Sequence, residues 1–308
     1  MVLTTGIPTG TRFLGLLNNA GHAPIFGALA LIVSRLMPAR GARSAAGGAT
    51  AGIAPGARHY LAAFGITVTA GIAVELIQSR IGRGASVMDI VMDTVGAAAA
   101  LCLAAAYQFR RGTLRLRAGL IGVALVAIAV VLAPLVEGAL AYARRQAMFP
   151  VIAGFERRLD LYFIEGAGAE IQRTTLPMSW AGGQLLTALQ VRLGRAENPG
   201  LRLNEPAPDW RGYRRLKLDL VNPGARPLQL MIRVHDIAHD QRHEDRFNLP
   251  FTLPASSRRV LDIPLQDIAN APDRRRLDLG RVAGVVLFER SQPAPVGATF
   301  YLHQIWLE

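Results

Sequence analysis

Residues 75–96 have the sequence ELIQSRIGRGASVMDIVMDTVG, and this stretch decides the architecture of the first half of the chain. It places charged and amide side chains between two long apolar segments. Glu75 and Gln78 are three residues apart. Asp89 and Asp93 are four apart, so each pair would share one face of a helix. The stretch therefore predicts two apolar helices joined by a short turn, with a polar cluster where the helices meet.

Charged side chains in such an apolar setting are costly, which favours a function for them. Ionisable groups at membrane depth cost about 2.5 to 3.5 kcal/mol each on insertion scales, so they usually face a bundle interior and mark a functional site. The alternative is a salt-bridged cluster that only fixes helix topology, because charges near helix ends can reach the headgroup region cheaply. The predicted membrane polar cluster comprises His22, Glu75, Gln78, Arg83, Ser86, Asp89 and Asp93.

The chain changes character near Pro150. Its 308 residues have a mean hydropathy of +0.27 and a net charge of +12. Up to residue 150, thirteen arginines stand against four acids, whereas residues 151–308 hold 21 basic and 18 acidic residues. Arginines between apolar segments are typical topology signals of membrane proteins, so the basic excess does not indicate a nucleic-acid partner. We predict two domains, residues 1–149 and 150–308.

Four apolar segments in the first half are candidates for membrane spans, at residues 23–37, 59–79, 86–109 and 116–143. The last three reach the roughly 20 residues that the hydrocarbon core needs, and together they exceed what a soluble helical core needs. Arginines concentrate in the loops after the first and third segments, which places those loops in the cytoplasm. We expect a multi-pass protein of the cytoplasmic (inner) membrane with an extracytoplasmic C-terminal domain. His22, at the outer end of the first span, would then lie level with the polar cluster.

The spacing of the polar residues resembles a known family. The residues that carry this likeness are His22-Ala-Pro-Ile-Phe26, Glu75-x-x-Gln78, Arg83-x-x-Ser86-x-x-Asp89 and Gly96. Over about residues 15–110 they resemble the VanZ-like family of small membrane proteins, which is named for a member tied to resistance against lipoglycopeptide antibiotics. The resemblance implies a protein of the cell envelope.

After Pro150 the pattern changes to short alternating runs broken by Gly and Pro, which is typical of an all-β sandwich or barrel. The expected strands cover residues 160–164, 186–193, 216–220, 228–237, 259–263, 284–288 and 299–307. Seven or eight strands in a domain of this size predict a jelly roll. The predicted fold is therefore an α-helical membrane bundle of about four helices, followed by an all-β jelly-roll sandwich.

Three motifs of the second half follow one another as Asn198-Pro-Gly-Leu-Arg-Leu, Asp209-Trp-Arg-Gly-Tyr213 and Ile232-Arg-Val-His-Asp236. Their order resembles galactose-binding-like jelly rolls, especially family 11 carbohydrate-binding modules, and implies a glycan or lipid-linked saccharide as ligand. Sugars present a hydroxyl rim and an apolar face, which planar polar side chains beside aromatic rings can match. The candidate ligand-binding residues are Trp210, Tyr213, Arg233, His235, Asp236, Arg246 and Asn248. Trp210 and Tyr213 are equally good core residues, because large aromatics dominate sandwich interiors.

A zinc site and soluble catalysis have weaker support. His235, His239 and His243 recur every four residues, which would suit zinc on a helix. The alternation of residues 228–237 instead favours a strand that runs into a polar loop at residues 239–248. We therefore expect no metal and no cofactor.

Whether the chain is an enzyme stays open. It contains no nucleophile elbow, no phosphate-binding glycine-rich loop with Lys and no His-Glu-x-x-His motif. The alternative to a binding protein is a membrane-embedded enzyme that modifies an amphipathic envelope precursor, because a carboxylate and an imidazole at one membrane level can do acid/base chemistry. Its site would comprise His22, Glu75, Arg83 and Asp89.

Overall fold

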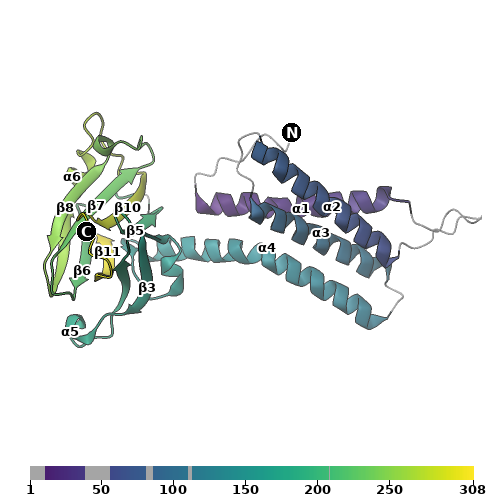
Figure 1. Ribbon diagram of the computed structural model, residues 1–308, viewed down its shortest axis with the longest axis horizontal. Helices are drawn as coiled ribbons and strands as arrows, with labels where there is room; N and C mark the ends of the chain where they lie inside the picture. Colours follow the sequence, from purple (N-terminus) through teal and green to yellow (C-terminus); the bar gives the residue numbers. More distant parts are fainter. Residues whose placement is uncertain (1–10, 39–55, 81–85, 110–112, 208) are drawn as a thin grey trace, which may run out of the picture. The chain divides into compact units, whose positions relative to one another are not determined.

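A computed structural model describes residues 11–38, 56–80, 86–109, 113–207 and 209–308 (Figure 1). The chain divides into two compact units, Met1–Ala139 and Leu140–Glu308. The division by contacts therefore lies about ten residues before the change of composition at Pro150.

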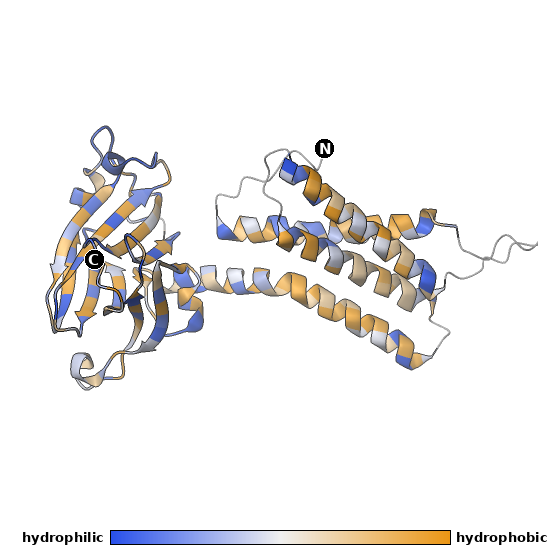
Figure 2. Ribbon diagram, in the orientation of Figure 1, coloured by the Kyte–Doolittle hydropathy of each residue, from blue (hydrophilic) through white to orange (hydrophobic). Residues whose placement is uncertain are grey.

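Four long helices account for the described part of the first unit, and the last of them continues into the second: α1 (Arg12–Leu36), α2 (Ala57–Arg80), α3 (Val87–Gln108) and α4 (Leu114–Met148). Each is long and apolar enough to cross a membrane, and orange dominates their ribbons in Figure 2. Large apolar side chains such as Ile66 and Leu125 are at least half exposed. Such faces suit lipid as their surrounding.

The first helix begins eleven residues before the expected start of the first span. The Thr11 hydroxyl accepts a hydrogen bond from the N–H of Leu14 at 3.2 Å, as an N-cap residue does. This part of the helix contains glycine and asparagine, which are weak helix formers, so the sequence pattern did not indicate it. His22 therefore lies well inside α1, and the prediction that it sits at the end of a span was wrong.

Small residues allow α1 and α3 to pack closely. A Cβ atom on Gly96 would overlap the carbonyl oxygen of Ala23, and one on Gly27 would lie 3.1 Å from the Gly96 carbonyl oxygen. Stripes of small residues have this role in membrane helix pairs. The close crossing brings the beginning of α3 next to the middle of α1.

Two antiparallel sheets form the jelly-roll sandwich of the second unit, which confirms the predicted fold class. One sheet has the order β3-β4-β11-β6-β9, with β1 paired to β11, and the other has the order β2-β5-β10-β7-β8 (Figure 1). The six-stranded sheet contains β1 (Val151–Ala153), β3 (Ala169–Thr175), β4 (Thr187–Leu193), β6 (Arg215–Asn222), β9 (Ser257–Pro264) and β11 (Thr299–Leu307). The five-stranded sheet contains β2 (Ile164–Ala167), β5 (Gly200–Asn204), β7 (Leu228–Asp236), β8 (Phe247–Leu253) and β10 (Val282–Glu289).

One apolar core lies between the sheets. Along β7 the side chains of Leu230, Ile232 and Val234 are fully buried and alternate with partly exposed neighbours, of which only Met231 is apolar. Period-two alternation of this kind places one face of a strand in the core. The outer face of the same strand is then free to carry function.

The last turns of α4 belong to the sandwich unit. Ala141 is buried in the sandwich core, and the ring of Tyr142 meets that of Phe163 edge-on at 5.0 Å. Arg144 binds the Asp160 carboxylate through two nitrogens, one of them at 3.0 Å. These contacts explain why the unit begins at Leu140.

The strand prediction was wrong at residues 160–164, and it missed β1, β3, β5 and β8. Residues 158–161 form a 3₁₀ turn, because the Asp160 carboxylate accepts the N–H of Arg157 at 2.8 Å, and β2 begins only at Ile164. Strand β8 was predicted as part of a polar loop and a connection. It contains Pro250 and still forms a strand because it lies at the edge of its sheet.

Candidate functional site

Two places in the structure gather the residues that the sequence singled out, one in the helices and one on the sandwich. In the helices, His22 of α1 lies between the two aspartates of α3. Its Nδ1 is 3.0 Å from Asp93 Oδ1, and its Nε2 is 3.8 Å from Asp89 Oδ2. The Asp93 side chain is only 3% exposed, and the Phe26 ring stacks on the imidazole at 6.5 Å. The histidine thus bridges two carboxylates.

Glu75 of α2 contacts the same cluster from the third helix. Its Oε2 accepts the backbone N–H of Ser86 at 2.9 Å, and the Ser86 hydroxyl accepts the N–H of Asp89 at 3.2 Å. Glu75 is buried, and its Oε1 has no hydrogen-bond partner in the part of the chain described. Gln78 is half-buried on α2, whereas Arg83 lies outside the described residues. The helical cluster therefore joins His22 and three carboxylates from three helices.

The outer face of the five-stranded sheet collects most of the remaining candidates, and we call it the arginine face. It comprises Arg202 on β5, Met231, Arg233 and His235 on β7, Gly284, Val286 and Phe288 on β10, Arg246, and Asn248 on β8. The register places Arg233 between Asn248 and Val286, and Met231 beside Phe288. Four of the seven residues predicted to bind a ligand thus lie side by side.

Arg233 is fixed at the centre of the arginine face. Its guanidinium lies 5.1 Å from the centre of the Phe288 ring, and its Nε donates to Asn248 Oδ1 at 3.3 Å. Burial, followed by the charges of Arg246 and Arg202, lowers the pKa of Arg233 to about 10. The side chain stays charged at neutral pH and is held by an aromatic ring and an amide.

His235 lies flat against the backbone of the neighbouring strand. A Cβ atom on Gly284 would come within 2.8 Å of its Nε2, so only glycine leaves room for the imidazole. Burial lowers the pKa of His235 to about 4, and His239, Arg233 and Arg246 act in the same direction. Its Nδ1 is buried without a hydrogen-bond partner among the described residues. His235 is therefore a neutral imidazole at pH 7 with a hydrogen-bonding atom to spare.

Arg246 lies next to the imidazole of His239. His239 Nε2 lies 3.5 Å from Arg246 Nη1. His239 Nδ1 is 3.2 Å from the carbonyl oxygen of Asp245 and 3.5 Å from its carboxylate. The Nε atom of Arg246 is buried and has no hydrogen-bond partner in the described ranges. The loop that contains His239 and Asp245 thus positions the guanidinium of Arg246, which has one donor without a hydrogen bond.

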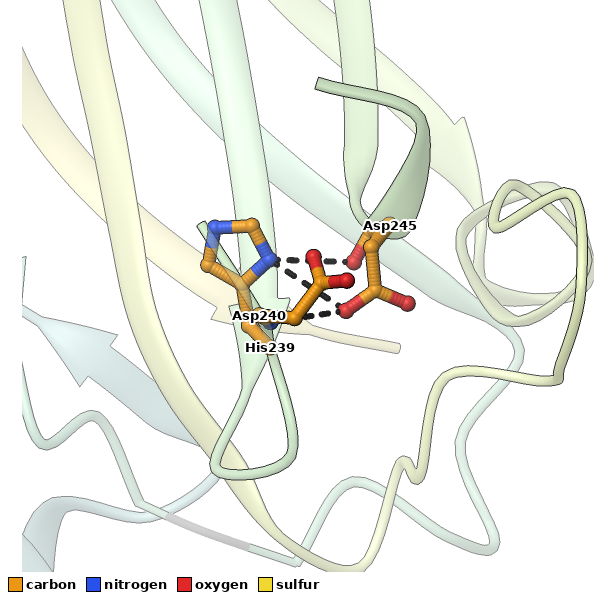
Figure 3. A group of neighbouring side chains, drawn as sticks. All are labelled: His239, Asp240 and Asp245. Carbon is orange, nitrogen blue, oxygen red and sulfur yellow. Dashed lines mark hydrogen bonds and ion pairs between the residues drawn. The ribbon is translucent and has the colours of Figure 1, made fainter. Parts of the chain in front are cut away.

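His239, Asp240 and Asp245 (Figure 3) also lie close enough to share a metal ion, with ligand atoms within 4.8 Å of one another. The carboxylate of Asp245 is already engaged, however. It accepts the Asp240 N–H at 2.9 Å and Arg275 Nη2 at 3.0 Å, and these bonds hold its pKa far below the usual range. An ion would have to displace the guanidinium, so this group fits the anchoring of a loop better than metal binding.

The structure places the other candidates elsewhere. Trp210 is fully buried and donates its indole N–H to the Ala207 carbonyl at 2.6 Å, so it belongs to the core. Tyr213 packs edge-on against Phe149 at 5.3 Å beside the same core. The Asp236 side chain is fully buried against Arg275. We therefore correct the assignment of Trp210 and Asp236 as ligand-binding residues, because neither offers a surface.

Sequence reasoning did not predict five members of the arginine face as binding residues, and it missed a second surface. Only the register of β5, β7 and β10 brings together Arg202, Met231, Gly284, Val286 and Phe288. The second surface is a polar cavity of about 290 Å³ on the other sheet. It is lined by Glu170, Gln172, Gln190, Arg192, Gly297 and Thr299. Cross-strand spacing could have suggested this cavity only with the pairing known.

Comparison with known proteins gives similarities to solved structures alone. No family model matches the chain, and no curated protein matches its sequence. An exo-beta-agarase is 16% identical over 51% of this chain and 24% of its own, with a TM-score of 0.41. A family 11 carbohydrate-binding module from Clostridium thermocellum, in complex with a β-1,3-1,4-mixed-linked tetrasaccharide, is 18% identical over 51% of this chain and 93% of its own, with a TM-score of 0.36. A mutant of a family 29 carbohydrate-binding module is 14% identical over 51% and 89%, with a TM-score of 0.32. The chain thus spans about a quarter of the agarase.

Proposed function

We propose that this chain is an integral membrane protein of the cell envelope, of VanZ-like type, whose sandwich binds a glycan or lipid-linked sugar on the arginine face. The observation that carries the proposal is the gathering of the partly exposed Arg233, Arg246 and Asn248 beside the apolar side chains of Met231 and Val286 on one face of a sheet. Guanidinium and amide groups offer hydrogen-bond donors and acceptors to the hydroxyl groups of a sugar.

The chemistry of the arginine face suits a saccharide. Arg233 and Asn248 are planar and are already oriented by each other. Met231 and Val286 are half-exposed on the same face and supply apolar contact area. A binding site with few, well-placed polar groups among apolar ones is typical for small ligands.

The membrane part of the proposal is supported by the four apolar helices and by the arginine distribution of the sequence. Together they favour a multi-pass protein of the cytoplasmic membrane whose sandwich lies outside the cytoplasm. His22, Glu75 and Asp89, which gather in the helical cluster, are among the residues that resemble the VanZ-like family.

The alternative function is a membrane-embedded enzyme that acts on an amphipathic envelope precursor. The observation in its favour is the imidazole of His22 between two carboxylates, an arrangement able to accept and return a proton. In that case His22→Ala would abolish turnover of the precursor and leave glycan retention by the sandwich intact.

The test of glycan binding uses the full-length protein in lipid nanodiscs on an array of envelope glycans. We expect retention of at least one glycan, with a loss of about tenfold or more for Asn248→Ala, which removes a group that orients Arg233. Gln190→Ala, in the cavity of the other sheet, is the control for the choice of face. Retention that depends on Gln190 and not on Asn248 would move the site to the other sheet, and no retention of any glycan would refute the function.

A further inference from the structure

We propose that the glycan taken by the arginine face is acidic, a saccharide that carries carboxylate or phosphate groups held by Arg233 and Arg246. The inference rests on the proposed function and names the class of its ligand. What points to an anion is the pairing of the arginines in the sandwich.

Most partly buried arginines elsewhere in the sandwich unit contact a carboxylate, whereas Arg145 donates to the Glu205 carbonyl oxygen and lies over the rings of Tyr142 and Phe163. Arg144 binds Asp160, Arg258 binds Asp219 with its Nη2 at 2.6 Å, and Arg275 binds two aspartates. Guanidinium–carboxylate pairs of this kind are the usual way to keep a partly desolvated charge in a fold.

Arg233 and Arg246 depart from this pattern. Arg233 has an aromatic ring and the neutral amide of Asn248 as its partners, and Arg246 has the imidazole of His239. No ion pair is recorded for either guanidinium within the described parts of the chain. The exposed Glu244 acts on Arg246 only through space. Two partly buried cations therefore lie on one face without a carboxylate bonded to them.

The acidic side chains near the face are bonded to another arginine or lie opposite one. Asp236 and Asp245 both bond to Arg275 behind the face, two carboxylates to one guanidinium. On β2, Glu165 lies opposite Arg202 in the register. Arg233 and Arg246 therefore have no bonded carboxylate among the described residues.

The cations on the face also repel one another. The pKa of Arg233 is lowered by burial first and then by Arg246 and Arg202, and the pKa of Arg246 is lowered by burial. A bound anion would offset these effects on the pKa values, because an opposite charge nearby favours the charged form. Binding of a neutral sugar would leave the repulsion in place.

The experiment measures binding to the full-length protein in nanodiscs of zwitterionic lipid by isothermal titration calorimetry. One pair of probes is trigalacturonic acid and the trisaccharide made from it by carboxyl reduction. A second pair is glucose 1-phosphate and glucose, and inorganic phosphate is measured alone. Within each pair the two probes share the same sugar and differ in charge. The first pair therefore tests for a carboxylate ligand and the second for a phosphate ligand.

We expect one acidic probe to bind at least tenfold more tightly than its neutral counterpart, with an affinity that falls as salt is raised from 50 to 200 mM. Arg233→Gln and Arg246→Gln should each weaken it about 10- to 100-fold, since each removes a charge-assisted hydrogen bond. Arg233→Lys should recover only part of the loss, because lysine keeps the charge and lacks the planar fork. Arg259→Gln, the same charge change at an exposed position of β9, should change affinity by less than twofold.

Each contrary result has a distinct meaning. Equal binding of neutral and acidic probes, with Arg233→Gln no weaker than Arg259→Gln, would overturn the acidic ligand and leave the glycan site standing. Inorganic phosphate binding as tightly as the sugar probes would show that the sugar is not recognised, which would overturn the proposed function. No binding of any probe would overturn both. Intrinsic tryptophan fluorescence checks that each variant is folded.

Discussion

Replacing Asp236 by Asn should destabilise the sandwich rather than act on a ligand. The Asp236 side chain is fully buried and accepts Arg275 Nη1 at 2.6 Å, Arg275 Nη2 at 2.8 Å and the N–H of Asp278 at 2.8 Å. Asparagine is nearly isosteric but removes the charge and replaces one acceptor by a donor, which then faces a guanidinium or an N–H. The substitution therefore loses one or two of the three bonds at the end of β7, depending on which oxygen the amide nitrogen replaces, and removes the charge that Arg275 faces.

The magnitude follows from the burial of this pair. Breaking a buried ion pair by removing one partner costs about 3 to 5 kcal/mol. Arg275 is 26% exposed and keeps its bonds to Asp245, which argues for the lower end, about 3 kcal/mol. For a unit of this size each kcal/mol shifts the melting temperature by roughly 2 to 4 °C. We expect a decrease of about 6 to 12 °C.

The assay is thermal melting of the full-length protein in detergent, followed by tryptophan emission. All three tryptophans, Trp180, Trp210 and Trp306, lie in the sandwich, so the signal reports this unit alone. Asp262→Asn is the matched control, since the pair of Asp262 with Arg215 is largely exposed and such pairs contribute about 1 kcal/mol or less. A shift for Asp236→Asn no larger than that of the control would refute the structural role.

The destabilisation by Asp236→Asn should also depend on pH. Burial raises the pKa of Asp236, but the bonds from Arg275 and Asp278 outweigh it and hold the pKa below its ordinary value. The folded pKa is thus lower than the unfolded one, so the stability from this carboxylate is complete above the unfolded pKa of about 4. It is lost as pH falls through the folded pKa. The difference in melting temperature between wild type and Asp236→Asn should therefore be full at pH 7 and shrink below pH 4, and a constant difference would contradict the linkage.

Three further predictions concern the two halves of the chain. A fragment of residues 140–308 should melt cooperatively and several °C above a fragment of residues 150–308, because only the longer one keeps Ala141 and its neighbours against the core; equal melting temperatures would contradict this. Gly96→Val should lower the yield of monodisperse protein on size-exclusion chromatography, whereas Gly119→Val, with open space around it, should not; equal yields would count against the close crossing of α1 and α3. A reporter that is active only after export, fused after residue 308, should be active, and a signal only from a cytoplasmic reporter would reverse the proposed topology.

The sequence was most informative where one signal extends over many residues. The run without charged residues from 118 to 136 indicates a span by itself, because length and apolarity are properties of the segment alone. Alternation likewise located β7 almost to the residue, since one face of the strand is buried and the other is not. Local signals were weaker at α1, where glycines and asparagines reduce the helical pattern, and at β8, where Pro250 is tolerated only because the strand is at an edge.

The sites divide in the same way between sequence and tertiary structure. By itself the sequence identified residue types and spacings, so His22, Glu75, Asp89 and Asp93 could be grouped before any contact was known. Only the tertiary structure decided which charged side chains of the sandwich are paired with an opposite charge in the interior and which have no such partner. Asp236 and Arg233 are three residues apart on one strand, yet one is satisfied by Arg275 and the other faces outward. The physical reason is that strand pairing, not neighbourhood in the chain, determines which charges meet and which remain available to a ligand.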